Sequence, residues 1–588
     1  MFPGCGDHGP LAALYGTAGF RTSGGWDEQR GWSGRKSLRL QHLVCYDAIM
    51  RSSRFLPVAI LTVVISALAG GFFGSSRMAT DDEIDQQYRV FTSALAAIER
   101  DYVEDVPSDR LVYAAIDGML HTLDPHSNFF DPKSYAQMRE RQEGRYYGLG
   151  ITIQVLDGDI TVMSIFEGSP AYRKGLRRLD VIARIAGADA KGWTSDEAVR
   201  KLKGPKGTSV NISIRRRGYE GLIDMDVVRD EVNITTVRGT FMLDGNTGYV
   251  KLAEFSATSD RELGDALEAL MGKGMKRLVL DLRDNPGGAL EQAIKISNRF
   301  LPRGDLIVYT RGRVPNSDQD YRATEQSDYT HLPMVTLVNR NSASASEIVS
   351  GALQDHDRSL VVGETTFGKA LVQSVYRIAE GAGVAVTTGR YYTPSGRLIQ
   401  RPWDGTFDEY LTYTLRDQTG SRQHQSAELK YTDAGRKVYG GGGIEPDKFI
   451  VGSIEGFNPT RFGRQLYARQ SFAGFADQFT AEGDTRMSAA NQAKKKIARG
   501  FTLTDAMLND FTAMLTTQKV KIDADGFAKD EVFIRAMIHF EIDAALFGID
   551  EARRNLIAHD PQARFAVSLF PEAEQLIAMA RPARGQGR

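Results

Sequence analysis

The stretch "MVTLVNRNSASASEIVSGALQ", Met334–Gln354, decides the fold of the largest predicted domain. It begins with a short apolar run, continues through a polar turn and ends in apolar residues at helical spacing. An upstream stretch, "RLVLDLRDNPGGALEQAIKISNRFL", repeats the order of strand, tight turn and helix. This alternation is typical of an α/β sheet. Functional sites of such sheets usually lie at the carboxyl ends of the strands, where both turns are placed.

Ser344 is the best-placed nucleophile in the first of these turns. The apolar helix face begins at Ala345, so Ser344 stands between the predicted strand and the helix N-terminus. There the helix dipole and free N–H groups can stabilise a developing oxyanion. The alternative is structural, because Ser344 and Glu347 also fit a capping box, and helix caps are far commoner than nucleophiles.

No histidine is spaced to activate Ser344. His356 lies twelve residues along the same helix, about 18 Å away, and His331 precedes the strand. Lys369 opens a strand-like run, and it can act as a base if burial lowers its pKa to about 7–8. Gln373 lies on the same strand face and could hydrogen-bond the amine. A surface lysine is the alternative on local evidence.

The glycines of "DNPGG" complete a candidate site. Gly287 and Gly288 follow a strand and precede a helix, so their N–H groups can turn towards the site. Together with the N–H of Ala345 they would form an oxyanion hole. An ordinary turn is the alternative, because Pro-Gly is a common turn dipeptide.

Composition excludes several classes of protein. The chain has 588 residues, which predicts several domains, and a formal net charge of −1, which offers no basic field for nucleic acid. Its two cysteines, Cys5 and Cys45, lie near the N-terminus. A disulfide framework or a cysteine-rich zinc site is therefore excluded for the body of the chain.

Residues 50–76 have the pattern of a signal peptide or membrane anchor. Arg51 and Arg54 precede an apolar run, and we expect membrane association, if any, through residues 55–74. Either alternative exports the remainder, to the periplasm or to the outer side of the cytoplasmic membrane. Residues 1–49 are interpreted as a non-native or disordered extension, with Met50 as the hypothetical true start.

The rest of the chain divides by pattern. Residues 80–143 have helical periodicity, and residues 144–232 show short β-like runs with one helix, as in a small partly open barrel. The α/β core follows over residues 233–455. Residues 460–588 are helical again, with no role that the sequence assigns. The predicted fold class is therefore a multidomain protein with an α/β core, an inserted β domain and helical regions at both ends.

Several motifs in order resemble the carboxyl-terminal processing protease family of serine–lysine peptidases. They are "LDPHSNFFDP", "GLGI", "EGSPAYRKGLRRLDVI", "DLRDNPGG", "SASASEIVSGALQD", "VVGETTFGKALVQ" and "YYTPSGRLIQ". The resemblance covers about residues 82–450. It implies a PDZ domain over residues 144–232, inserted before a serine–lysine protease core.

The resemblance also implies roles for individual residues. Ser344 would be the nucleophile, Lys369 the general base and Gln373 its orienting partner, with oxyanion donors from Gly288 and Ala345, and Gly287 as an alternative. Supporting positions in the family match Arg283, Glu347 and Asp355. The loop Gly148, Leu149, Gly150 and Ile151 would bind the C-terminal carboxylate of a substrate through backbone N–H groups.

These features together predict a serine endopeptidase that cleaves proteins near apolar or unfolded C-termini. We expect no metal or organic cofactor; an adaptor or activating partner and an oligomer are left open. Two positions depart from the family pattern: Ala370 replaces the usual glycine after the lysine, and "KGLRRLDVI" lacks the usual proline-glycine. The alternative is a catalytically silent PDZ scaffold that binds C-terminal tails, and Ala370 is the feature in its favour.

Overall fold

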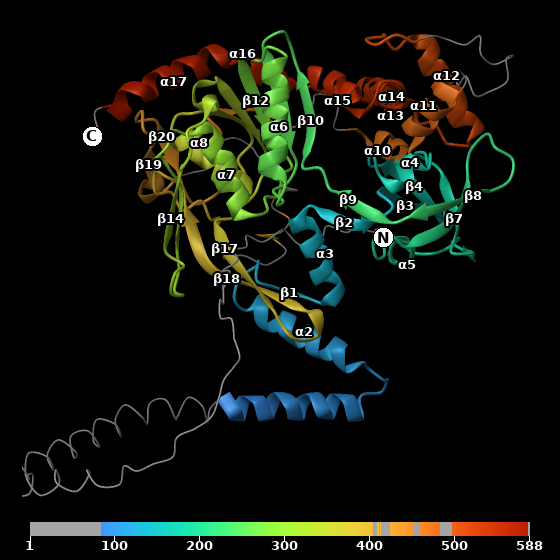
Figure 1. Ribbon diagram of the computed structural model, residues 1–588, viewed down its shortest axis with the longest axis horizontal. Helices are drawn as coiled ribbons and strands as arrows, with labels where there is room; N and C mark the ends of the chain where they lie inside the picture. Colours follow the sequence, from blue (N-terminus) through green and yellow to red (C-terminus); the bar gives the residue numbers. More distant parts are fainter. Residues whose placement is uncertain are drawn as a thin grey trace, which may run out of the picture. The chain divides into compact units, whose positions relative to one another are not determined.

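The computed structural model describes residues 84–403, 409, 410, 412, 424–451, 459–481 and 497–585 (Figure 1). The predicted extension at 1–49 and the predicted signal or anchor at 50–76 lie outside these residues. The chain forms two compact units, and the larger one contains residues 120–588. Among the described residues, no helix is both long and apolar enough to cross a membrane.

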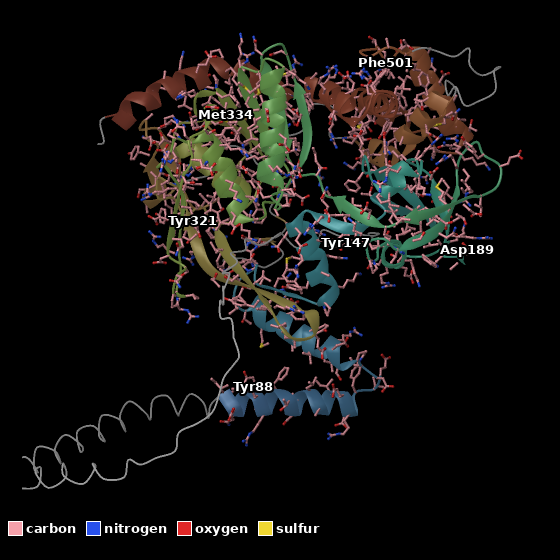
Figure 2. The ribbon with its side chains drawn as sticks, viewed as in Figure 1. Tyr88, Tyr147, Asp189, Tyr321, Met334 and Phe501 are labelled. Atoms are coloured by element: carbon pink, nitrogen blue, oxygen red, sulfur yellow. The ribbon has the colours of Figure 1, made fainter. Side chains whose placement is uncertain are left out.

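The described part of the smaller unit is helical, as predicted. A helix covers residues 84–101, and α2 (Ser108–His121) follows. Tyr88, Phe91 and Ile98, apolar side chains at helical spacing on the first helix, are exposed, and Tyr88 is labelled in Figure 2.

The region predicted to be a small barrel with a helix has that architecture. One sheet has the order β3-β4-β5-β7-β8, with β6 paired to β5, and a separate ribbon pairs β2 with β9. The helix α5 (Ser195–Leu202) begins at a capping box made by Thr194 and Glu197. The remaining elements are β2 (Arg145–Gly148), β3 (Ile151–Leu156), β4 (Asp159–Ile165), α4 (Pro170–Arg173), β5 (Val181–Ile185), β6 (Ala188–Asp189), β7 (Ser209–Arg215), β8 (Ile223–Val228) and β9 (Asp230–Asn233).

A six-stranded sheet forms the predicted α/β core, in the order β10-β11-β12-β15-β16-β21. The pairs from β11 to β21 are parallel, and β10 is antiparallel at the edge. Every residue of β15 is buried, as expected for a strand covered on both faces. The strands are β10 (Val237–Met242), β11 (Thr247–Leu252), β12 (Arg277–Asp281), β15 (Met334–Val338), β16 (Leu360–Gly363) and β21 (Lys448–Phe449).

A second sheet lies against this core and carries the residues that follow Lys369. It has the order β1-β18-β13-β14, and β17 also pairs with β18. Its strands are β1 (Asn128–Phe130), β13 (Leu306–Arg311), β14 (Gln319–Arg322), β17 (Leu371–Arg377) and β18 (Gly383–Tyr392). The helix α3 (Pro132–Glu143) follows β1, and a small ribbon pairs β19 (Leu429–Tyr431) with β20 (Lys437–Tyr439).

Helices cover both faces of the parallel sheet (Figure 1). On one face α6 (Ser259–Gly272), α7 (Leu290–Phe300) and α8 (Ala345–Asp355) enclose the largest hydrophobic cluster. On the other, α16 (Pro561–Ser568) and α17 (Phe570–Gly585) pack on β12, β15 and β16. The end of the C-terminal region is therefore part of the α/β core, which the sequence pattern does not reveal.

The first part of the C-terminal region is a separate bundle with its own core. It contacts the small β domain through Arg178 of that domain. The Arg178 guanidinium donates to the buried Glu541 carboxylate of the bundle and, at 3.1 Å, to Gln470. Arg178 belongs to the turn that lacks proline-glycine, and Leu179 there adopts a φ of 66°. The bundle helices are α10 (Arg461–Ala468), α11 (Ser471–Ala481), α12 (Asp505–Thr517), α13 (Ala524–Lys529) and α14 (Glu531–Leu546), followed by α15 (Ile549–Ala558). The structure thus confirms the predicted fold class.

Candidate active site

Ser344 lies between the carboxyl end of β15 and the first residue of α8. Its backbone has a φ of 57° and a ψ of −113°, a strained conformation for a residue with a side chain. The side chain is fully buried, and its Oγ has no hydrogen-bond partner among the described residues. A strained turn that holds an uncommitted hydroxyl at a helix N-terminus is the arrangement of a nucleophile elbow.

Glu347 makes half of the capping interaction that the sequence predicts. Its Oε2 accepts the N–H of Ser344 at 2.7 Å and the N–H of Lys369 at 2.9 Å. Its Oε1 accepts the N–H of Gly368 at 2.6 Å and the hydroxyl of Thr366 at 2.5 Å. Burial raises the pKa of Glu347 to about 7, although these hydrogen bonds favour the charged form. One carboxylate therefore joins the serine turn to the lysine segment.

Lys369 is fully buried immediately before β17. Its Nζ donates to Oε1 of Gln373 at 3.0 Å, the contact predicted from their spacing. Burial lowers the pKa of Lys369 to about 8, while the carboxylates of Asp124 and Glu347 act in the opposite direction. About a tenth of the amine is therefore neutral at pH 7, and this fraction, which a base requires, grows as the pH rises towards 8.

Tyr391 of β18 provides a second bridge between the serine and the lysine. Its hydroxyl lies 3.1 Å from the carbonyl oxygen of Ser344 and 2.6 Å from that of Lys369. The tyrosine is fully buried, so water cannot replace these contacts. Two residues 25 positions apart in the sequence are thus fixed side by side.

The glycine turn lies against the same serine. A Cβ added to Gly287 would stand 2.8 Å from the Cβ of Ser344 and 2.9 Å from the nitrogen of Ala345. The N–H of Gly287 donates to Asn285 at 2.9 Å. In the part of the chain that the structure describes, the N–H groups of Gly288 and Ala345 have no protein acceptor. These two are therefore the better candidates for oxyanion donors.

Arg283 and Asp355 lie in buried networks around the site. The guanidinium of Arg283 contacts Asp281 of β12, and it donates to Asp560 at 2.6 Å and to Gln562 at 2.7 Å. Asp355, at the end of α8, forms an ion pair with Arg397. These contacts suit support of the turns rather than reaction with a substrate.

Neither His356 nor His126 is placed to act as an alternative base. His356 is bound to Asp433 and to the carbonyl oxygen of Leu306 at the far end of α8. His126, in the turn between α2 and β1, contacts the Tyr410 hydroxyl at 2.8 Å. Sequence reasoning did not place His126 near Lys369. The motif "LDPHSNFFDP", which contains His126, is the signal that could have indicated it.

The loop Gly148–Ile151 joins β2 to β3, and α5 packs on β3. Gly150 has a φ of 80°, which lets successive N–H groups turn the same way. The N–H groups of Gly150 and Ile151 interact with the Tyr146 hydroxyl, and burial raises the pKa of Tyr146 to about 12. The loop therefore already presents backbone donors to an oxygen atom.

No group of three or more metal-ligating side chains that could hold a metal ion occurs among the described residues. Ala370, the departure beside the lysine, is buried in the hydrophobic core of the α/β domain. Its N–H donates to Gln400 at 2.8 Å. Its methyl group thus belongs to the packed interior.

Comparisons with known proteins agree with this architecture. The model of peptidase family S41 matches residues 246–406, and the PDZ domain model matches residues 137–215. The model described as the activating protease CtpB N-terminal domain matches residues 73–134.

Two curated relatives match this chain over most of their own length. The carboxy-terminal-processing protease of Bartonella bacilliformis is 36% identical over 57% of this chain and 80% of the relative. The carboxy-terminal processing protease CtpA of Bacillus subtilis is 33% identical over 66% of this chain and 81% of the relative. Among solved structures, the photosystem II D1 C-terminal processing protease matches 52% of this chain and 88% of its own, with 30% identity and a TM-score of 0.30.

The shared features are a PDZ domain followed by an S41 core, in relatives that are themselves carboxy-terminal processing proteases. The chain therefore belongs to peptidase family S41, as a serine peptidase of the carboxy-terminal processing type.

Proposed function

We propose that Ser344 is the nucleophile of this peptidase, that Lys369 is its general base and that Gln373 orients the lysine. The observation that carries the proposal is the double bridge by Glu347 and Tyr391, which joins the backbones of Ser344 and Lys369. The uncommitted Oγ of Ser344 and the lowered pKa of Lys369 support it.

The reaction follows from these positions. Oγ of Ser344 attacks the scissile carbonyl carbon while neutral Lys369 accepts the hydroxyl proton. The N–H groups of Gly288 and Ala345 stabilise the oxyanion. The protonated lysine then gives its proton to the leaving amine, which leaves an acyl-enzyme. A water molecule, deprotonated by the same lysine, hydrolyses that ester and frees the serine.

The substrate class is a protein with a free C-terminus that is apolar or unfolded. In this proposal the carboxylate binds the N–H groups of the loop Gly148–Ile151 and displaces the Tyr146 hydroxyl. Burial of Leu149 at this loop supports an apolar neighbourhood for the final side chain of the substrate. The scission itself takes place in the α/β core.

The second candidate is a catalytically silent scaffold that binds C-terminal tails. The feature in its favour is the methyl group of Ala370, next to Lys369. Because that residue is buried in the hydrophobic core, and because Ser344, Lys369 and Gln373 are all present, the structure gives this candidate little support.

The test is a cleavage assay with the full chain and an unfolded protein that ends in an apolar tail. Ser344→Ala and Lys369→Ala are the comparison variants, and mass spectrometry follows the fragments. The proposal expects cleavage by the parent only. A second substrate with an amidated C-terminus is the matched control for carboxylate recognition, and it should be cleaved more slowly. Tail binding without cleavage by any form would favour the scaffold.

We further propose that residues 50–76 export the protein, so that the peptidase acts in the periplasm or on the outer side of the cytoplasmic membrane. The charged start and the apolar run of this segment support the proposal. The intact mass of the native precursor and the N-terminal sequence of the mature form test it. A cytoplasmic location, or a native precursor that retains residues 1–49, would contradict export from Met50.

A further inference from the structure

A short turn remote in sequence from the candidate catalytic residues contacts them directly. The turn Asp124–Ser127 follows α2 and precedes β1, and Gln373 lies 247 residues beyond its His126. Asp124, His126 and Ser127 are all buried. A buried polar turn needs internal hydrogen-bond partners, and the identity of those partners indicates its role.

The carboxylate of Asp124 fixes the shape of the turn. Its Oδ1 accepts the N–H groups of His126 at 2.7 Å and of Ser127 at 2.8 Å. Its Oδ2 accepts the Ser127 hydroxyl at 2.8 Å. That hydroxyl in turn accepts the N–H of Thr387 on β18 at 3.2 Å. These bonds determine the direction of the His126 carbonyl group.

The His126 carbonyl oxygen accepts a hydrogen bond from Nε2 of Gln373. The other end of that amide, Oε1, accepts the amine of Lys369 at 3.0 Å. Because the amide group is planar, a fixed acceptor for its NH₂ end also decides which way its oxygen faces. Without that acceptor, the amide could turn its NH₂ group towards the lysine.

The His126 ring contacts two aromatic residues. One ring nitrogen contacts the Tyr410 hydroxyl at 2.8 Å, and the ring meets Phe367 edge to face at 6.3 Å. Burial lowers the pKa of His126 well below its usual range, and the cations of Lys369 and Arg401 add to this effect. The ring is therefore neutral and adds no second cation beside the lysine.

We propose that the turn Asp124–Ser127 is a positioning element that holds Gln373 and, through it, the amine of Lys369 in place for proton transfer from Ser344. Asp124 and His126 are positioning residues: His126 contacts Gln373, Asp124 holds His126, and neither takes part in bond changes. The proposal rests on the proposed roles of Ser344 and Lys369.

The pKa of Lys369 depends on the charged groups around it. A purely structural role of the turn would not change that pKa. The carboxylates of Asp124 and Glu347 raise the pKa of Lys369, against the larger effect of burial. The other titratable or charged groups around it come from three elements: His126 on the turn, Tyr391 on β18, and Arg401 and Tyr410 in the segment after β18. Removal of the Asp124 charge should lower the pKa of Lys369 further.

The test compares Asp124→Ala and Asp124→Asn in the full chain, with kcat and KM measured across pH on an unfolded protein substrate. Asparagine keeps an oxygen that can cap the turn but removes the charge, so it separates geometry from electrostatics. Asp131→Ala is the matched control, because Asp131 also caps backbone N–H groups nearby: it is the N-cap of α3 and accepts the N–H of Ser134 at 2.6 Å. Ser344→Ala and Lys369→Ala are run alongside.

We expect Asp124→Ala to lower kcat about 10- to 100-fold with KM changed less than about twofold, since misplacement of a catalytic group acts on the chemical step. Asp124→Asn should recover most of kcat and move the acid limb of the pH profile lower by about half a unit to one unit. Asp131→Ala should leave kcat and the acid limb of the pH profile unchanged.

A loss of kcat no greater than that of Asp131→Ala, or an unmoved acid limb in Asp124→Asn, would overturn the inference. If Asp124→Ala does not fold, Ser127→Ala, which removes the hydroxyl that joins Asp124 to the N–H of Thr387, decides by the same comparison of kcat with Asp131→Ala. Failure of the proposed roles of Ser344 and Lys369 would give a different result from failure of this inference, because Lys369→Ala would then be as active as the parent.

Discussion

The carboxylate of Glu347 accepts the backbone N–H of Lys369 at 2.9 Å, and the same oxygen accepts the N–H of Ser344 at 2.7 Å. A residue that fits a helix cap in the sequence is thus the link between the two residues proposed to exchange a proton. Glu347 thus makes its half of the predicted capping box and also joins the two residues of the proposed catalytic arrangement, so the two interpretations of the serine turn do not compete.

The pH profile should report the lysine. Because burial lowers the pKa of Lys369 to about 8, kcat/KM should fall as the pH drops below about 8 and the amine becomes charged. Glu347 titrates near 7 in contact with the same segment, so the measured value belongs to the pair. Lys369→Arg, which is charged at every accessible pH, should be inactive throughout. A parent profile that is flat from pH 6 to 9 would contradict a lysine base.

The same group makes stability depend on pH. The folded pKa of Lys369, about 8, lies below the unfolded value of 10.5, so the unfolded state binds more protons between these values. The contribution of this lysine to the free energy of unfolding should therefore increase as the pH rises from about 8 to about 10.5. Comparison of denaturant unfolding curves of the parent and Lys369→Met isolates it: the parent should be the more pH-dependent of the two in this window.

Glu347→Gln should remove activity and stability together. The Glu347 carboxylate accepts four hydrogen bonds, two on each oxygen, so in the glutamine variant two of these donors would face an NH₂ group. A buried donor without an acceptor costs about 1–3 kcal/mol. We expect a loss of kcat/KM of at least about 100-fold, because the serine and the lysine lose their common anchor.

Glu262→Gln is the control for that change. Glu262 accepts the N–H groups of Thr236 at 2.7 Å and Val237 at 3.1 Å, at the start of β10. It should lose stability but keep the kcat/KM of the folded enzyme. Equal losses of activity in both variants would show that Glu347 acts on stability alone.

Gly287→Ala should disable the oxyanion turn. The new methyl group would stand 2.7 Å from the carbonyl oxygen of Ala343 and 2.8 Å from the Cβ of Ser344, at a φ of 98°. Gly274→Ala is a matched control, since Gly274 has a φ of 86° and nothing within 4 Å of the added Cβ. Both variants carry the backbone penalty of about 1 kcal/mol. Only Gly287→Ala should also lower kcat, and an equal kcat in the two variants would count against the proposed turn.

Asp560→Ala should destabilise the α/β core, although the residue lies far beyond the predicted domain. It would remove one partner of the buried Arg283 guanidinium, and we expect the free energy of unfolding to fall by about 3 kcal/mol. The control is Glu254→Ala beside Arg238, a side chain that is 51% exposed, where the expected loss is below about 1 kcal/mol. Chemical denaturation measures both. A loss of under 1 kcal/mol at Asp560 would show that α16 does not support this arginine.

Local patterns in the sequence determined much of this protein. The apolar run of β15, the turn before α8 and the alternation of short strands each follow from residues close together in the chain, because strands, turns and helices depend on local periodicity. The spacing of Lys369 and Gln373 on one strand face also follows from strand geometry alone. The order of the motifs was specific enough to predict the family.

Only the tertiary structure decided what surrounds those residues. That Glu347 and Tyr391 bridge the serine and the lysine depends on how α8 and β18 each contact the segment that holds Lys369. That His126 reaches Gln373, and that Asp560 reaches Arg283, depends on contacts between segments hundreds of residues apart. Burial, which lowers the pKa of Lys369, is a property of the assembled core and has no signature in any short stretch of the chain.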